Sequence, residues 1–265
     1  MHHSKYIIML GSIIGDIVGS TYEFHNTLDY NFELFPQGST FTDDTVCTIA
    51  VADAILRGIP YRDSLHDWCN RYPHRGYGGM FRQWIHSDNP QPYNSFGNGA
   101  AMRVSPIGWA FPHPGEAMNE ARKTAECTHN HPEGIKGAET IAACVNYLVT
   151  HHDTDYARKM VNDLCAANYG PDYQHHLPEP GLFDVTCQGC VPLAVTLFLE
   201  SKDFEDAIRL AVSYGGDSDT LGCIVGSLAG AAYDIPAPFK VKALSLLPEE
   251  MQTVVIHFYA RFINP

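Results

Sequence analysis

The sequence predicts an all-α protein, a compact helical bundle that forms a single domain over residues 1–265. Apolar residues recur at three-to-four spacing along most of the chain, and the alternating pattern of β-strands is nearly absent. Apolar residues make up 45% and charged residues 18% of the 265 residues, a composition that can bury a substantial core. This length also allows two small domains, but no linker or block of like charge marks a boundary.

The strongest helical periodicity falls in eight segments, namely Asp43 to Leu56, Pro114 to Cys127, Pro132 to Val149, Tyr156 to Ala166, Val191 to Leu199, Phe204 to Val212, Asp219 to Tyr233 and Pro248 to Phe262. Helix-start signals agree, since Asp203 stands directly before Phe204. Between helices lie loops rich in turn formers, chiefly Arg71 to Gly79, Ser87 to Gly99 and Gly170 to Gly181. Long ordered loops in a compact helical domain are usually binding elements.

Glycine recurs at every fourth residue in two segments far apart in the chain, Gly11, Gly15 and Gly19 near the start and Gly222, Gly226 and Gly230 near the end. Glycines four apart line one face of a helix and permit close approach of another backbone. That contact must offset a propensity cost of roughly 1 kcal/mol per glycine. We expect both helices to be central and to pack together. Small residues that merely fill a crowded core explain the same spacing equally well.

The charge balance argues against a nucleic-acid partner. The chain has 17 Lys and Arg against 30 Asp and Glu, a formal net charge of −13, and no basic run offsets it locally. A phosphate-bearing small molecule could still bind if metal ions and backbone N–H groups supply the positive potential.

The expected location is the cytoplasm, without membrane insertion. Apolar stretches such as Ile224 to Ala232 are too short or too glycine-rich to span a bilayer, and Met1 to Lys5 does not begin a convincing signal peptide. Eight cysteines in a chain of this length favour reduced core thiols over a disulfide framework. Cys187 and Cys190 form a C-x-x-C, but no second pair completes a zinc site.

Two motifs with paired acids carry the chemical signal. Thr42-Asp43-Asp44-Thr45 stands where a helix begins, a position at which an N-cap explains one acid but not two. Gly215 to Thr220 repeats the pattern, with Asp217, Asp219 and Thr220 before the second glycine-rich helix. Neighbouring carboxylates and hydroxyls form the hard oxygen cluster that Mg²⁺ or Mn²⁺ prefers. If the fold brings both helix starts together, they form a binuclear metal site.

The order of motifs resembles the ADP-ribosylglycohydrolase family, which includes the dinitrogenase-reductase-activating glycohydrolase and the ADP-ribosyl-arginine and ADP-ribosyl-serine hydrolases. The matching segments run nearly end to end: Gly11 to Gly19 with Tyr22-Glu23-Phe24, Phe41 to Thr45, Gly97 to Arg103, Thr128-His129, and Gly215 to Thr220. Each segment alone is weak evidence, but five in family order make a specific signal.

The resemblance implies an all-α fold with two Mg²⁺ ions, or Mn²⁺, at one end of a cleft. Its metal ligands match Thr42, Asp43, Asp44, Asp217, Asp219 and Thr220. The ions would hold the ribose hydroxyls and a water beside the anomeric carbon of ADP-ribose, where cleavage develops oxocarbenium character. The expected partner is free ADP-ribose, or a protein or small molecule that carries it.

The resemblance also assigns catalytic roles, to Asp43, Asp44, Asp219 and Glu23. Glu23 would be a solvated surface acid by default, but its place in Tyr22-Glu23-Phe24 resembles the glutamate loop of the serine-directed branch. We therefore expect a general acid/base or a metal contact there. Asp16 matches the family's first helix and receives only a supporting role, with a buried hydrogen-bonded acid as the equal alternative.

Substrate contacts are implied at three further places, comprising Gly97, Asn98, Gly99 and Ala100, then His129, then Gly189 and Cys190. The first group would cradle a diphosphate with backbone N–H groups, although a tight turn explains it locally. His129 would approach the phosphate or distal ribose, although a helix-end histidine is the simpler view. The third group would border the adenosine, where Cys187 and Cys190 depart from the family pattern.

Two other readings stay open. A catalytically inactive ADP-ribose-binding or crystallin-like protein could use the same fold, although it has no need to keep all four aspartates. A metal-dependent phosphohydrolase is more distant, because the five-motif order does not favour it. The acceptor linkage cannot be read from the sequence, and a monomer is the expected state.

Overall fold

The computed structural model describes residues 9–151 and 154–262, so the segment Met1 to Lys5 lies outside the described residues. Within these ranges the chain forms thirteen α-helices, two short 3-10 helices and no strand, apart from one isolated bridge between Gly97 and Thr186. The prediction of an all-α fold is confirmed. The helices are α1 Leu10–Gly19, α2 Asp43–Arg57, α3 Tyr61–Arg71, α4 Gly79–Ile85, η1 Asn98–Ala100, α5 Ser105–Ala110, α6 Pro114–Glu126, α7 Pro132–His151, α8 Asp155–Tyr169, η2 Tyr173–His175, α9 Cys187–Glu200, α10 Phe204–Tyr214, α11 Ser218–Ala232, α12 Ala237–Leu246 and α13 Glu249–Phe262.

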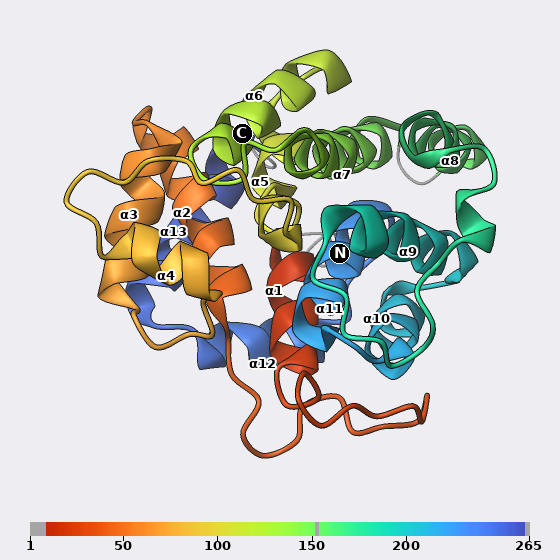
Figure 1. Ribbon diagram of the computed structural model, residues 1–265. Coiled ribbons are helices and arrows are strands. Elements are labelled where there is room, and N and C mark those ends of the chain that lie inside the picture. The colour runs from red at the N-terminus through yellow and green to blue at the C-terminus, as the bar shows by residue number, and fades with distance from the viewer. Residues whose placement is uncertain (1–8, 152–153, 263–265) are drawn as a thin grey trace.

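The centre of the molecule is the pair α1 and α11, around which the other helices are arranged (Figure 1). Every residue of α1 is buried, which explains its apolar sequence. A methyl group at Gly15 would lie 1.9 Å from the carbonyl oxygen of Gly222, and one at Gly11 would lie 2.2 Å from that of Gly226. The two backbones therefore touch directly. The glycine spacing correctly predicted this pairing.

The eight predicted helices are all present, with shifts at their ends. The largest shift is in α9, which begins at Cys187 rather than Val191 because Thr186 caps it by accepting a hydrogen bond from Gly189 N at 3.1 Å. Of the five other helices, α1 was expected from its glycine spacing, and α3, α4, α5 and α12 were not predicted. In α3 only Ser64, Leu65, Trp68 and Cys69 are buried, so its apolar stripe is short.

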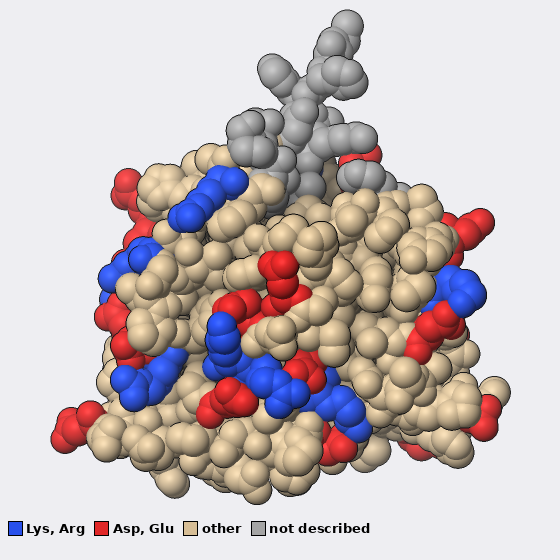
Figure 2. Space-filling model, turned by 90° about the horizontal axis from the view of Figure 1, so that it is seen from above, with Lys and Arg blue, Asp and Glu red and all other residues tan. Residues whose placement is uncertain are grey.

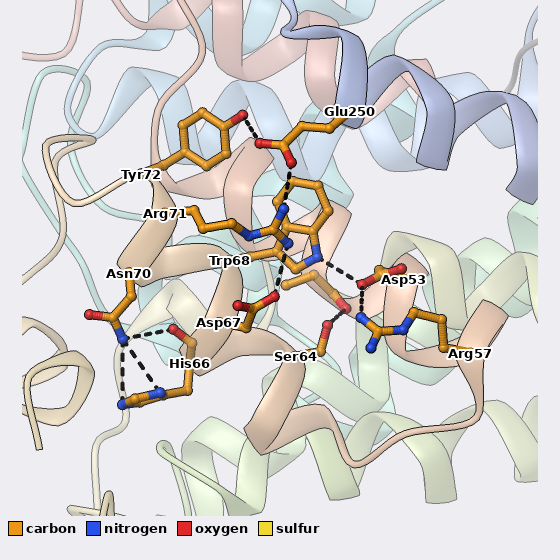
Figure 3. Close-up of polar contacts among 11 residues, drawn as sticks. Asp53, Arg57, Ser64, His66, Asp67, Trp68, Asn70, Arg71, Tyr72 and Glu250 are labelled. Atoms are coloured by element: carbon orange, nitrogen blue, oxygen red, sulfur yellow. Dashed lines mark hydrogen bonds and ion pairs between the residues drawn. The ribbon is translucent and has the colours of Figure 1, made fainter. Parts of the chain in front are cut away.

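A polar network supports α2, the helix that begins with the first pair of acids (Figure 3). Trp68 of α3 donates from Nε1 to Asp53 of α2 at 2.9 Å. Arg71 stacks on Trp68, with its guanidinium carbon 3.7 Å from the ring centroid, and pairs with Glu250 of α13 at 2.5 Å. Tyr72 donates to the same glutamate. The network thereby ties α3 to α2 through Asp53 and to α13 through Glu250.

The face seen in Figure 2 carries Lys and Arg side chains interspersed with Asp and Glu. Among the ion pairs of the molecule, Arg122 of α6 pairs with Glu139 of α7 at 2.7 Å, and Lys136 pairs with Glu133 within α7 at 2.8 Å. Seven of the eight cysteines are buried and all eight are free thiols. Among residues 9–151 and 154–262, none of the helices combines the length and apolar character needed to cross a bilayer.

The close approach of α1 and α11 generates a stability prediction. We expect Gly15→Ala to lower the free energy of unfolding by about 2 kcal/mol or more, because the added methyl overlaps backbone atoms of α11 that cannot move aside independently. Urea unfolding followed by circular dichroism would measure the change. Gly115→Ala is the matched control, since this glycine of α6 has no atom within 4 Å of the added methyl. Equal stability of the two variants would contradict the proposed backbone contact.

Candidate active site

Asp16 organises the start of α2 from its position in α1. One carboxylate oxygen accepts from Thr42 N at 3.0 Å and Thr45 N at 3.1 Å, and the other accepts from Thr42 Oγ1 at 2.6 Å. Thr45 Oγ1 adds a further hydrogen bond. Amide groups at a helix start lack partners within the helix, so this buried acid adds, from outside the helix, to the cap in which Thr42 Oγ1 accepts from Asp44 N at 3.4 Å. It fixes the direction in which the next residues project.

The start of α11 reaches the same place. Gly19 of α1 is packed so closely that a methyl group there would lie 2.5 Å from the Cα of Asp219. Thr220 Oγ1 donates to Asp44 Oδ2 at 3.3 Å, which joins the starts of α11 and α2 directly. Asp217 accepts from Asn98 Nδ2 at 2.7 Å, which adds the η1 turn. Both acidic motifs therefore lie at one end of the helix pair.

Five carboxylates form two overlapping triads. Oxygens of Asp16, Asp44 and Asp219 lie within 4.8 Å of one another, as do oxygens of Glu23, Asp217 and Asp219. Asp219 belongs to both. Asp44 Oδ1 is buried and has no hydrogen-bond partner among the described residues. A buried carboxylate oxygen without a donor is costly, so this arrangement suits oxygen-seeking cations.

Burial and mutual repulsion shift the titration of these acids. Burial raises the pKa of Asp16 to about 7 and that of Glu23 to about 8, and the charge of Asp219 adds to both shifts. Burial likewise raises the pKa values of Asp43, Asp44, Asp217 and Asp219. Without compensating positive charge, the cluster therefore favours protonated carboxyl groups.

Glu23 is held over the cluster by its own loop. Asn26 donates from Nδ2 to the carbonyl oxygens of Tyr22, Glu23 and Gly216 at 2.7, 3.0 and 2.9 Å. Its Oδ1 accepts from Gly216 N at 2.7 Å. One amide side chain therefore ties the loop of Glu23 to the turn that precedes Asp217.

A cavity of about 340 Å³ opens beside the acids. Its walls come from the α1–α2 loop, α2, the loop after α3, the η1 turn, the α8–α9 loop and α11. The predicted residues that line it are Glu23, Asp43, Asp44, Gly97, Asn98, Gly99, His129, Asp217, Asp219 and Thr220. The cavity thus combines a carboxylate end with a turn rich in small residues.

Comparison with known proteins identifies a family that shares this sequence and fold. The model of the ADP-ribosylglycohydrolase family matches residues 6–252. The ADP-ribosyl-[dinitrogen reductase] glycohydrolase of Rhodospirillum rubrum is 26% identical, with 89% of each chain covered. Human ADP-ribosylhydrolase ARH3 is also 26% identical, over 85% of this chain and 84% of its own. A solved structure titled ADP-ribosylglycohydrolase-related protein complex superposes with a TM-score of 0.74 at 24% identity, covering 98% of each chain.

The chain belongs to the ADP-ribosylglycohydrolase family. This is a family of enzymes that hydrolyse glycosidic bonds, as the names of its members state.

Not every predicted residue of this ADP-ribosylglycohydrolase reaches the cavity wall. Thr42 is buried behind it, with its hydroxyl bonded to Asp16 and within 3.3 Å of Asp44 Oδ2. Ala100 is fully buried in η1. Gly189 packs against Asp184, whose Oδ2 would lie 2.0 Å from an added methyl group. Cys190 is 3% exposed in α9, in a small separate cavity that also touches Asp217. Their predicted substrate and metal contacts stay predictions.

Several cavity residues were not predicted. Phe24 and Phe183 stack across the mouth with ring centroids 5.9 Å apart, although they are separated by over 150 positions in the chain. Met80 is 56% exposed and lies on the same rim. Arg103 is entirely buried and lines the cavity from within. Sequence could have suggested Arg103, because it ends the motif that starts at Gly97, whereas the loop aromatics carry no periodic signal.

The raised pKa of Asp16 predicts how stability depends on pH when a chelator is present. The folded pKa of about 7 exceeds the ordinary value of 3.8, so the folded protein holds a proton that the unfolded chain releases. This contribution to stability is fully present below pH 3.8 and is lost as pH rises through about 7. We therefore expect the free energy of unfolding to fall between about pH 5 and about pH 8.

Asp16→Asn should make this pH dependence less steep, because the amide cannot titrate and keeps an acceptor oxygen toward Thr42. Glu23, whose pKa is raised to about 8, would still contribute the remainder. Urea unfolding at both pH values measures the difference, with Asp63→Asn, an exposed acid on α3, as the control. If Asp16→Asn and the unsubstituted protein lost the same free energy over this range, Asp16 would not be the group responsible.

Proposed function

We propose that this chain is a Mg²⁺-dependent hydrolase that cleaves the glycosidic bond between ADP-ribose and a modified acceptor, and so reverses ADP-ribosylation. The observation that carries the proposal is the pair of carboxylate triads beside the cavity, which share Asp219. Within each triad the carboxylate oxygens lie within 4.8 Å of one another. Relatives named for hydrolysis of ADP-ribosyl groups support the same reading. Mn²⁺ is the alternative ion, since it accepts the same oxygen ligands.

The residues present fit a pair of divalent ions. The candidate ligands are Thr42, Asp43, Asp44, Asp217, Asp219 and Thr220, all from the two helix starts. Their carboxylate and hydroxyl oxygens are the donors that Mg²⁺ selects, and the partnerless Asp44 Oδ1 has a lone pair to offer. When bound, such ions would orient ribose hydroxyls and lower the pKa of a water beside the anomeric carbon.

The chain's own residues supply the rest of the chemistry. The acids around Asp219 place negative charge where oxocarbenium character develops at the anomeric carbon. Glu23, held above them by Asn26, can pass a proton to the leaving acceptor or take one from the attacking water. Its elevated pKa of about 8 in the ion-free protein suits a group that carries a proton near neutral pH.

The side of the cavity formed by the η1 turn is suited to the diphosphate. Gly97, Asn98 and Gly99 form its wall, and a side chain at Gly99 would meet the ring of His129 at 3.1 Å. Small residues let the backbone approach an anion closely. The N–H groups of Gly97 and Asn98 already donate to Ser95 Oγ and Val185 O, and that of Ala100 lies 3.4 Å from Gly97 O. Because the chain carries few basic groups, the N–H of Gly99 and the ring of His129 would take the place of a Lys or Arg clamp.

We extend the proposal to location and assembly. Eight free thiols suit a reducing compartment such as the cytoplasm. The cavity is built from one chain, so a monomer contains every residue that the mechanism uses.

The test is a parallel assay of ADP-ribose release from arginine-linked, serine-linked and acetyl-linked ADP-ribose, with Mg²⁺, with Mn²⁺ and with chelator. We expect release from at least one substrate, and only when a divalent ion is present. Release from a single substrate would identify the acceptor. Tight ADP-ribose binding without release from any would favour the inactive, binding-only member of the fold.

Asp219→Ala should abolish turnover while leaving the helical fold, because Asp219 is the carboxylate common to both triads. Calorimetric titration with Mg²⁺ should show weakened binding, and circular dichroism should be unchanged. Asp172→Ala, at an exposed acid of the α8–α9 loop, serves as the control. Full activity of Asp219→Ala in the presence of chelator would contradict the metal-dependent mechanism.

Glu23→Gln should keep Mg²⁺ binding and lose roughly 100-fold or more in kcat, because the amide preserves shape but cannot transfer a proton. Steady-state release of ADP-ribose measures kcat, and Mg²⁺ titration measures the affinity. The matched control is Glu33→Gln, an exposed glutamate in the same loop. An unchanged kcat would remove Glu23 from the mechanism.

A further inference from the structure

Arg103 is a charged group in an unusual place. It follows the η1 turn and is the largest fully buried side chain of the described residues. Within residues 9–151 and 154–262, no carboxylate forms an ion pair with it. Its Nη2 donates to Thr124 O at 2.5 Å and to Thr128 Oγ1 at 2.8 Å, and both acceptors are uncharged. A buried cation held by neutral groups needs a reason beyond stability.

The second acceptor leads to a histidine. Thr128 Oγ1 lies 2.7 Å from Nδ1 of His129. The histidine ring is 6% exposed and packs against Tyr93, with centroids 5.7 Å apart. Its backbone N–H donates to Ala125 O at 2.7 Å, which fixes the start of the side chain. Arg103, Thr128 and His129 thus form a continuous hydrogen-bonded relay.

The direction of each hydrogen bond follows from the chemistry of the groups. Guanidinium groups only donate, so the Thr128 oxygen accepts from Arg103. The single hydroxyl hydrogen of Thr128 then has two neighbouring acceptors, Nδ1 of His129 at 2.7 Å and the sulfur of Cys127, which is a weak acceptor. If Nδ1 carried the proton instead, this buried hydroxyl would keep only the weak contact with sulfur. Nδ1 therefore accepts, and the neutral ring carries its proton on Nε2.

That proton faces the cavity. A methyl group at Gly99 would lie 3.1 Å from Nε2, and one at Gly97 would lie 3.5 Å from it. Both glycines and His129 line the cavity beside the acids. No described residue is recorded as an acceptor for Nε2. The donor is over nine-tenths buried and is directed at the space that a ligand would occupy.

We propose that Arg103 and Thr128 are positioning residues that lock His129 in the tautomer with hydrogen on Nε2, so that it donates to an acceptor oxygen of the bound ligand. This inference rests on the proposed function only for the identity of the ligand, ADP-ribose. The relay also explains why an unpaired guanidinium is retained in the core, since its charge orients Thr128 and opposes a second proton on the ring.

The electrostatics agree with this geometry. Burial, followed by the positive charge of Arg103, lowers the pKa of His129 well below its ordinary value of 6.5. The other titratable groups near the relay are Tyr93, Cys47, Cys127 and Cys187. Burial raises the pKa of Tyr93, Cys127 and Cys187, and the hydrogen bond with Cys69 followed by burial raises that of Cys47, so all four are uncharged near neutral pH. The ring therefore stays neutral and presents the same donor across the physiological range.

Thr128→Val tests the relay, because it removes the hydroxyl and keeps the shape. We expect the KM for the ADP-ribosylated substrate that the protein hydrolyses, and the Kd for ADP-ribose, to rise about tenfold. The kcat should change less than about twofold, since no recorded hydrogen bond joins the relay to Glu23 or Asp219. Thr128→Ser should restore both constants. Thr124→Val is the matched control, because its buried hydroxyl donates to Ala121 O at 2.8 Å and, within the described residues, forms no recorded hydrogen bond with the side chains of the relay.

Nitrogen-15 NMR of the histidine rings, recorded on the ligand-free protein, tests the tautomer without any assay of activity. The unsubstituted protein should show His129 with a protonated Nε2 and a bare Nδ1 that do not titrate near neutral pH. Thr128→Val should show mixed tautomers or titration. A protonated Nδ1 in the unsubstituted protein, or equal losses for Thr128→Ser and Thr128→Val, would overturn the relay. A fixed tautomer without ADP-ribose binding would instead reject the proposed function.

Discussion

The direct contact between the backbones of α1 and α11 is the constraint on which the site depends. Glycine at each crossing removes the side chains that would separate the two helices, and Gly19 brings α1 against the Cα of Asp219. Asp16, three residues before Gly19, then lies beside the start of α11 as well as that of α2. A helix spacing of ordinary width, about 8–10 Å between axes, would hold these carboxylates apart. Packing therefore creates the electrostatic cluster.

That cluster opposes folding unless its charge is reduced. Burial raises the pKa of each acid, and the repulsion falls only when protons or cations enter. Asp16 differs from its neighbours because Thr42 and Thr45 already surround it with donors. Asp44 keeps a bare oxygen instead. The hydrogen-bond pattern therefore distinguishes the two acids. Asp16 stabilises the fold through its hydrogen bonds, whereas Asp44 has an oxygen that could accept a ligand.

The sequence predicted the parts of this design that have a local or periodic signal. The glycine spacing predicted the central helix pair. Of the paired acids at the two helix starts, Asp44, Asp217 and Asp219 meet in the triads, whereas Asp43 lines the cavity outside both. Position within the cavity was less predictable. Gly189 and Cys190 do not line the cavity, because α9 begins four residues earlier than its periodicity suggests; Cys190 is buried in the first turn and Gly189 packs against Asp184. The contact of Phe24 with Phe183 joins two loops, and loop conformation leaves no repeating pattern to read.

Glu23 shows how a loop residue can be placed as firmly as one on a helix. Asn26 uses both polar atoms of its side chain on the peptide groups of Gly216 and on the carbonyls of Tyr22 and Glu23. This arrangement requires glycine at position 216, because the φ of +82° is unfavourable for other residues and an added methyl group would lie 2.4 Å from the carbonyl oxygen of Leu182. The turn before Asp217 and the loop of Glu23 are therefore one polar unit. Any displacement of Glu23 must break hydrogen bonds to the turn that leads into α11, so the loop acid and the helix acids keep a common geometry.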